Sequence, residues 1–216
     1  IAGLVKGASK GEGLGNQFLA NIRETDAILH VVRCFDNDNI IHVDSSVDPV
    51  RDKETIDIEL QLKDLETVEK RLERVKRTAK TGNKDAQTEL VVLLKIQETL
   101  LKGVSVRALE FSEKEMEYVQ PLQFITSKPV LYVCNVDENS AVSGNKYVDL
   151  VKENVAIENA EVIVLAVATE ADITELEDYS ERQLFLEDIG LEEAGVARLI
   201  RAAYKLLNLQ TYFTAG

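Results

Sequence analysis

Heptad spacing between residues 52 and 80 is the feature that most restricts how this chain can fold. The repeat consists of apolar residues seven positions apart and two valines between them, at Ile58, Leu65, Leu72, Ala79, Val68 and Val75. Only Gln61 interrupts the series, which is typical of a coiled-coil helix. A turn at Thr81-Gly82-Asn83 precedes a second helical pattern over residues 85–102. Because the connection is so short, the two helices must run antiparallel, and the sequence predicts a helical hairpin.

The second helix of the hairpin ends at Gly103. One of its sides is expected to carry Ala86, Leu90, Leu93 or Leu94, Gln97 and Leu101.

Basic residues gather near the predicted tip of this hairpin. The chain as a whole has 25 Lys and Arg against 38 Asp and Glu, a net charge of -13, which argues against a general nucleic-acid coat. The cluster contains a single acid, Glu73, and seven bases, Lys70, Arg71, Arg74, Lys76, Arg77, Lys80 and Lys84. A solvated, solubilising face is the simpler interpretation. Few acids stand four residues away to neutralise the cluster, however, so it is also a candidate surface for an RNA-rich partner.

Three short apolar runs predict β-strands, at residues 27–32, 128–134 and 161–165. Helical patterns at residues 113–125, 147–154 and 192–207 alternate with them. A strand, a helix and a strand at this spacing form a right-handed βαβ unit, so the predicted fold is α/β with a parallel sheet. Cys34 and Cys134 each end an apolar run and are interpreted as small core residues. No run reaches the roughly 18 apolar residues of a membrane helix, so we expect a cytoplasmic protein without a membrane partner.

Polar side chains follow the strand at residues 128–134 directly. Asn135, Asp137 and Glu138 stand just past its carboxyl end, the edge at which open α/β sheets bind ligands. There the Asn amide could hold a loop while a carboxylate faces a ligand. A capping turn explains the same spacing equally well, and both interpretations stay open.

Two further segments are candidates for function. Residues 1–15 contain five glycines but no Walker A spacing, so a flexible loop is the simpler interpretation. His30 lies inside an apolar run and is interpreted as a sheet residue. His42, by contrast, lies in a loop of about fifteen residues, a length more typical of functional or mobile segments.

Several stretches of the chain are informative when taken together and in order. They are residues 1–16, His30-Val31-Val32-Arg33-Cys34-Phe35, the hairpin, Asn135-Val136-Asp137-Glu138 and residues 208–216. In this order and spacing they resemble the YchF or Obg-like ATPase family, a translation-associated branch of the P-loop NTPases. The resemblance implies a G-domain-like parallel sheet with a coiled-coil insertion. It divides the chain into G-domain parts at residues 1–51 and 111–207, the insertion at 52–110, and the start of a TGS domain at 208–216.

The resemblance also implies parts that this chain lacks. The chain begins without Met and stops straight after an aromatic, strand-like run, so both ends look like cuts through a larger protein. The resemblance implies that a missing N-terminal piece carries the phosphate loop and the magnesium ligands, and that the rest of the TGS domain follows Gly216. The implied cofactors are ATP or GTP, with Mg²⁺ in the intact protein. Phosphoryl transfer depends on the missing parts, so these residues alone are expected to be inactive.

The base-recognition quartet departs from the pattern of GTPases. Guanine is read by Asn-Lys-x-Asp, whose carboxylate accepts two hydrogen bonds, whereas this chain has Val136 and Glu138 in place of the Lys and Asp. Adenine offers an acceptor at the equivalent ring nitrogen, so we expect Glu138 not to enforce guanine and the backbone around Val136 to meet adenine. The small residues Ala166, Val167 and Ala168 are expected to form a loop behind the base.

At the phosphate end, the motif glycine is Gly3, and Leu4 stands where switch GTPases place a water-orienting Gln. His42 is therefore hypothesised to swing in and position the water.

The sequence is compatible with three functions. The first is an ATP-hydrolysing switch protein, and the second is a nucleotide-dependent module that binds the ribosome or ribosomal RNA through the hairpin tip. The third is a GTPase with an altered base motif. No DNA partner is expected.

Overall fold

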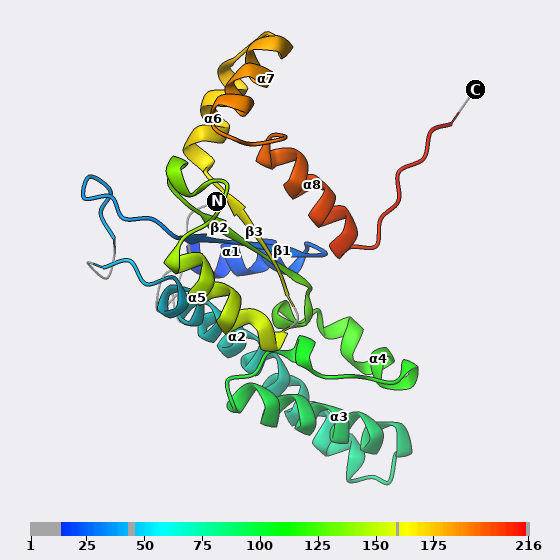
Figure 1. The fold of residues 1–216 in the computed structure, drawn as a ribbon. Helices are drawn as coiled ribbons and strands as arrows, with labels where there is room; N and C mark the ends of the chain where they lie inside the picture. Colours follow the sequence, from blue (N-terminus) through cyan, green and yellow to red (C-terminus); the bar gives the residue numbers. More distant parts are fainter. Residues whose placement is uncertain (1–13, 43–45, 159, 215–216) are drawn as a thin grey trace. The chain divides into compact units, whose positions relative to one another are not determined.

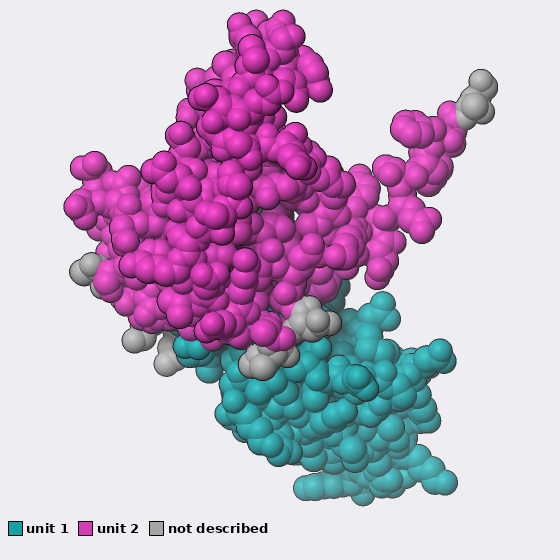
Figure 2. All heavy atoms as spheres, viewed as in Figure 1, with its two compact units in different colours: residues 1–26, 54–128 teal, residues 27–53, 129–216 magenta. Residues whose placement is uncertain are grey.

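The computed structural model describes residues 14–42, 46–158 and 160–214, and the chain divides into two compact units (Figure 2). Unit 1 comprises Ile1–Asp26 and Glu54–Lys128, and unit 2 comprises Ala27–Lys53 and Pro129–Gly216. These bounds differ from the four segments expected from the sequence, which stay a prediction. Within the described residues, every helix is too short or too polar to cross a membrane.

Unit 1 is built around the predicted helical hairpin (Figure 1). Its helices are α2 (Pro49–Ala79), which starts in unit 2, and α3 (Lys84–Leu101). The turn between them uses Gly82 at a positive φ of 84°, a conformation that favours glycine, and the Asn83 side chain caps α3 by accepting from the Ala86 N–H at 2.9 Å. The core of the hairpin consists of Val68, Leu72, Val75, Ala79, Ala86, Val92, Leu93, Ile96 and Leu100.

Two details of the predicted seam are wrong. Ile58 is 53% exposed, because α3 has only 18 residues against the 31 of α2 and cannot cover that far from the turn. Leu101 is 67% exposed as well, since the buried side of α3 advances from Ala86 to Glu89 and not to Leu90. Glu89 can face inward because its carboxylate accepts from Arg71 Nε at 2.6 Å.

The remaining helices of unit 1 are short. They are α1 (Leu14–Arg23) and α4 (Glu113–Val119), which Ser112 and Glu115 start with a reciprocal capping box. The helix expected over residues 113–125 ends early because Pro121 has no N–H to continue it. Single 3₁₀ turns follow at Gln120–Leu122 and Ile125–Ser127, and another lies at Val106–Ala108.

Polar side chains of α2 hold these turns in place. Gln61, the interruption of the heptad pattern, donates its amide to the Gly103 carbonyl at 3.1 Å. Asp64 is fully buried and accepts from the Ile125 N–H at 2.9 Å and from the Thr126 N–H and hydroxyl, both at 2.7 Å. Burial raises the pKa of the Asp64 carboxyl, and the hydrogen bonds from Thr126 and Ile125 oppose that rise.

Unit 2 contains a parallel sheet in the order β1-β2-β3 (Figure 1). The strands are β1 (Ile28–Arg33), β2 (Val130–Asn135) and β3 (Glu161–Leu165), so the three predicted strands and their parallel arrangement are confirmed. The central strand β2 is buried from Val130 to Cys134, as its continuous apolar run predicts.

The helices of unit 2 follow the strands along the chain. They are α5 (Lys146–Val155), α6 (Val167–Glu175), α7 (Tyr179–Asp188) and α8 (Gly195–Leu206), with 3₁₀ turns at Glu138–Ser140 and Ala156–Glu158. Apolar residues of α5 share the core with the sheet, and α8 lies against β2 and β3. Cys34 and Cys134 are free, fully buried members of this core, as expected. The hydrogen bond with Cys134, together with burial, raises the pKa of the Cys34 thiol.

We predict that Asp64→Ala strongly destabilises the protein. The change leaves buried donors of Ile125 and Thr126 without an acceptor, each at about 1–3 kcal/mol, so the free energy of unfolding should fall by about 3 kcal/mol or more. Urea denaturation at pH 7 measures this difference. Glu69→Ala is the matched control on the exposed side of α2 and should change stability by less than about 0.5 kcal/mol. A loss below about 1 kcal/mol for Asp64→Ala would contradict the role given to the carboxylate.

Candidate functional site

The carboxyl ends of β2 and β3 are joined by the Asn135 side chain. Asn135 is the last residue of β2, and its Oδ1 accepts from the Val167 N–H at 3.1 Å. One residue on, the Val136 N–H donates to the Leu165 carbonyl at 2.9 Å, so backbone and side chain close the same edge. The Asn amide therefore holds the segment that follows β3, and its acceptor meets the first residue of α6 (Val167–Glu175). We call Asn135, Val136, Leu165, Ala166 and Val167 the strand-end turn.

Asp137 and Glu138 have different surroundings in the segment that follows. Asp137 caps the turn at Glu138–Ser140, with its carboxylate accepting from the Ser140 N–H and hydroxyl at 3.1 Å. The capping interpretation therefore holds for Asp137. The Glu138 side chain is exposed and forms no hydrogen bond or ion pair with the described part of the chain, although the Glu138 carbonyl accepts from the Ala141 N–H at 3.0 Å. Its carboxylate is thus accessible to a ligand.

The prediction that residues 166–168 form a loop is wrong. Ala166 is buried and precedes α6, which begins at Val167, so Val167 and Ala168 belong to a helix. A helix can start there because the Asn135 oxygen accepts the Val167 N–H, which α6 itself leaves without an acceptor. The residues expected beside a base are therefore brought together at the carboxyl ends of β2 and β3, but around a helix N-terminus.

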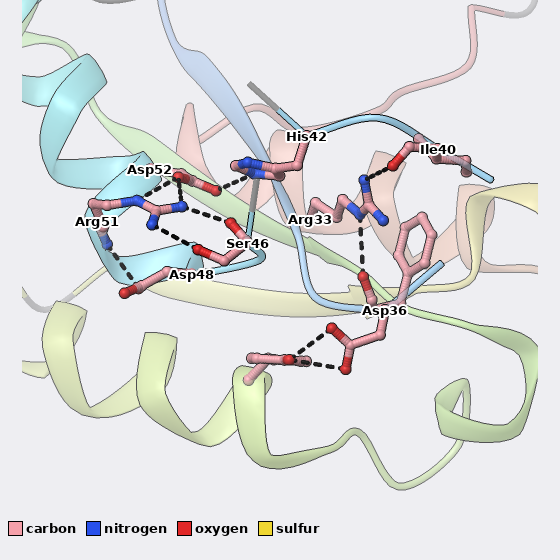
Figure 3. A network of polar contacts seen from close by, with 10 residues as sticks. Arg33, Asp36, Ile40, His42, Ser46, Asp48, Arg51 and Asp52 are labelled. Atoms are coloured by element: carbon pink, nitrogen blue, oxygen red, sulfur yellow. Dashed lines mark hydrogen bonds and ion pairs between the residues drawn. The ribbon is translucent and has the colours of Figure 1, made fainter. Parts of the chain in front are cut away.

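His42 lies in the segment between β1 and α2, apart from the strand-end turn in sequence (Figure 3). Its Nε2 lies 2.8 Å from Asp52 Oδ2, and both side chains are half-buried. Arg51 donates to the second oxygen of Asp52 at 3.0 Å and to the Ser46 carbonyl at 2.7 Å. The imidazole is therefore held by the first turn of α2.

The rest of this segment is also held by side chains. Arg33, the last residue of β1, donates to the carbonyls of Phe35, Asn37 and Ile40, each at 3.1 Å. The Tyr147 hydroxyl donates to the Asp36 carboxylate at 2.8 Å, and this hydrogen bond raises the pKa of Tyr147 (Figure 3). Sequence reasoning did not find Arg33, Arg51 or Asp52. Asp52 could have been found, because it is the acid in the first turn of α2, where the helix dipole favours negative charge and the preceding loop lies close by.

The other predicted site residues have distinct positions. Gly3 lies outside the described residues. His30 is a sheet residue beside Tyr132, with their ring centroids 5.5 Å apart. The described residues include no group of three or more His, Cys, Asp or Glu side chains that could hold a metal ion.

The basic cluster is located at the turn end of the hairpin in unit 1. Two of its members are engaged, Lys70 with Glu66 and Arg71 with Glu89. Five members are exposed and form no ion pair with the described residues, Arg74, Lys76, Arg77, Lys80 and Lys84. The cluster is therefore a surface of five cations available to an anionic partner.

A parallel sheet whose strand ends carry the polar turn, with an inserted helical hairpin, defines a P-loop NTPase fold of the G-domain type. No family model matches the chain. It is 56% identical over 216 residues to the ribosome-binding ATPase YchF of Escherichia coli O157:H7, and 53% identical over 218 residues to that of Bacillus subtilis (strain 168). Each match covers the whole chain and 59% of the relative.

A solved structure gives the same result. The YchF GTPase of Schizosaccharomyces pombe matches the whole chain and 59% of its own length, with a TM-score of 0.85 and 35% identity. The chain belongs to the YchF family and spans about three fifths of the length of these relatives.

Proposed function

We propose that the protein containing this chain is a cytoplasmic nucleoside triphosphatase that uses ATP, with or without GTP, and associates with the ribosome. The relatives, a ribosome-binding ATPase and a GTPase, support this function. The observation that carries the choice of base is the strand-end turn, with Glu138 exposed beside it. The 216 residues alone are proposed to hydrolyse no nucleotide, because they contain no Walker A sequence.

Donor and acceptor matching favours adenine at this turn. A guanine-reading carboxylate accepts from the ring N–H and the exocyclic amine, and in this chain the Asp is lengthened to Glu138 and its Lys neighbour is Val136. The Val136 side chain is buried and its N–H donates to Leu165. The backbone group of Val136 that can meet a base is thus its carbonyl, which suits the amino group of adenine. A GTPase with an altered base motif is the alternative.

We predict that removing Glu138 leaves ATP binding almost intact. In the full-length protein, titration with labelled nucleotide should give ATP dissociation constants within about threefold for wild type and Glu138→Ala, since no base edge depends on the carboxylate. Glu153→Ala, an exposed acid on α5, is the control. A wild-type protein that binds GTP about 100-fold more tightly than ATP, with the preference lost in Glu138→Ala, would establish the GTPase alternative.

His42 is proposed to position the attacking water. Leu4 cannot orient water, and His42 lies on the segment after β1, where a change of side-chain contacts could bring the imidazole to the phosphates. In the structure its Nε2 contacts Asp52, so catalysis requires the imidazole to leave that carboxylate. Within this proposal Asp52 holds the resting position of His42.

We predict that His42→Ala lowers ATP turnover by about 10²-fold or more in the full-length protein, since a positioned proton acceptor contributes that much. The ATP dissociation constant should stay within about threefold, because His42 lies outside the strand-end turn. Single-turnover hydrolysis and equilibrium titration measure the two quantities. His30→Ala, a change at the sheet histidine, is the control for loss of an imidazole. Unchanged turnover at unchanged affinity would remove His42 from the mechanism.

The second proposed activity is docking on ribosomal RNA through the basic cluster. Five exposed cations without ion pairs can each neutralise a phosphate and release its counterion. The two engaged members, Lys70 and Arg71, contribute less because acids already neutralise them. A nucleotide-dependent binding module without hydrolysis would use the same surface.

We predict that Arg74→Glu and Arg77→Glu each weaken ribosome association and lower its salt dependence, by about one unit of log K against log salt per lost phosphate contact. Co-sedimentation of the full-length protein at several salt concentrations measures this slope. Lys114→Glu, an equal charge reversal on the exposed side of α4, should leave the slope unchanged. If all three variants behave alike, net charge and not this cluster determines binding. Intrinsic ATP turnover should be unaffected in each variant.

A further inference from the structure

A carboxylate of α6 caps the N-terminus of α8. Glu170, in the first turn of α6, accepts from the Gly195 N–H at 2.6 Å with Oε1 and from the Val196 N–H at 3.2 Å with Oε2. The N-cap residue of α8, Ala194, has no side-chain acceptor of its own. The first N–H groups of a helix need acceptors, and negative charge is favourable at this end of the helix dipole. Glu170 meets both requirements from 25 residues away.

The contact between the two helices leaves no room for a side chain at Gly195. A Cβ built there would lie 2.2 Å from Leu165 Cδ2 and 2.6 Å from Glu170 Oε1, both shorter than real Cβ contacts. Leu165 is buried at the end of β3 and has little freedom to withdraw. Gly195 therefore permits the close approach of α8 to β3 and α6, and a side chain there would displace the Leu165 side chain or the Glu170 carboxylate.

Both contacts of Gly195 lead into the strand-end turn. The Leu165 carbonyl accepts from Val136, and the Glu170 N–H donates to the carbonyl of Ala166, both at 2.9 Å. The next residue, Val167, donates to Asn135. A displacement of Leu165 or of the first turn of α6 would thus move the backbone groups proposed to meet the base.

We propose that Glu170 and Gly195 are positioning residues for the nucleotide base. Neither is proposed to touch the nucleotide; they fix Leu165, Ala166 and Val167, which in turn fix Asn135 and Val136. The inference rests on the proposed function, since it assigns the strand-end turn to the base. It adds a specific expectation. Displacing the backbone at the base end should weaken nucleotide binding, whereas the residues that act at the phosphates stay in place and kcat should change little.

The test uses the full-length protein with Gly195→Ala, Glu170→Ala and Glu170→Gln. The ATP dissociation constant should rise about tenfold or more for the first two, whereas kcat at saturating ATP should stay within about threefold. Glu170→Gln keeps one acceptor oxygen for the α8 N-terminus, so it should recover part of the lost affinity. If Gly195→Ala does not fold, the comparison of Glu170→Ala with Glu170→Gln still tests the proposal. The dissociation constants come from titration with a fluorescent ATP analogue and competition by ATP.

Ala202→Gly is the matched control. It removes a buried methyl group two turns further along α8, and glycine weakens the helix, so it should lower the melting temperature without changing ATP affinity. Equal loss of affinity in Ala202→Gly would overturn the proposal, because any destabilisation of α8 would then have the same effect. Unchanged ATP affinity in folded Glu170→Ala would overturn it as well. Wild-type protein that binds no ATP would instead refute the proposed function on which the inference depends.

Discussion

The hydrogen bond between the Asn135 side chain and the Val167 N–H is the contact on which the candidate site depends. Parallel pairing brings the ends of β2 and β3 together, but it leaves the chain free to diverge after Leu165. The Asn135 amide removes that freedom by supplying an acceptor to the N-terminus of α6. The Val136 N–H donates to the Leu165 carbonyl, which extends the parallel pairing by one residue. The edge is thus closed by one backbone and one side-chain hydrogen bond.

In unit 1, too, a polar side chain fixes irregular backbone by accepting hydrogen bonds from it, and this side chain is a buried carboxylate. Asp64 receives three hydrogen bonds from Ile125 and Thr126, and the 3₁₀ turn at Ile125–Ser127 leads directly to β2. Burying a charge is costly unless its lone pairs are satisfied, and the raised pKa of Asp64 reflects that cost. In unit 2, the buried Lys53 is paired with Glu158 at 2.7 Å. Polar groups thus specify the connections, while apolar groups supply the cores.

Sequence patterns predicted the three strands and the helical hairpin, but not α6, α7 or the polar partners of these elements. The apolar runs at β1, β2 and β3 and the heptad seam of α2 are local signals, and the structure confirms them except at Ile58, the end of the seam far from the turn. Errors arose where a distant residue overruled the local pattern. Glu89 faces inward because Arg71 pairs with it, and α6 starts at Val167 because Asn135 caps it. The Glu170 cap of α8 joins positions 25 residues apart, and no spacing rule connects them.

The two ends of the proposed nucleotide site differ in how firmly they are held. The base end consists of strand termini, a helix start and the close contact of Gly195 with Leu165, all in packed or paired backbone. The His42 segment is tied by side chains of Arg33, Arg51 and Asp52 at partly exposed positions, where water can replace either partner of a hydrogen bond. Breaking the contact between His42 and Asp52 therefore disturbs no packed core. Under the proposed function, the packed base end would hold the nucleotide while His42, which only side chains hold in place, changes position.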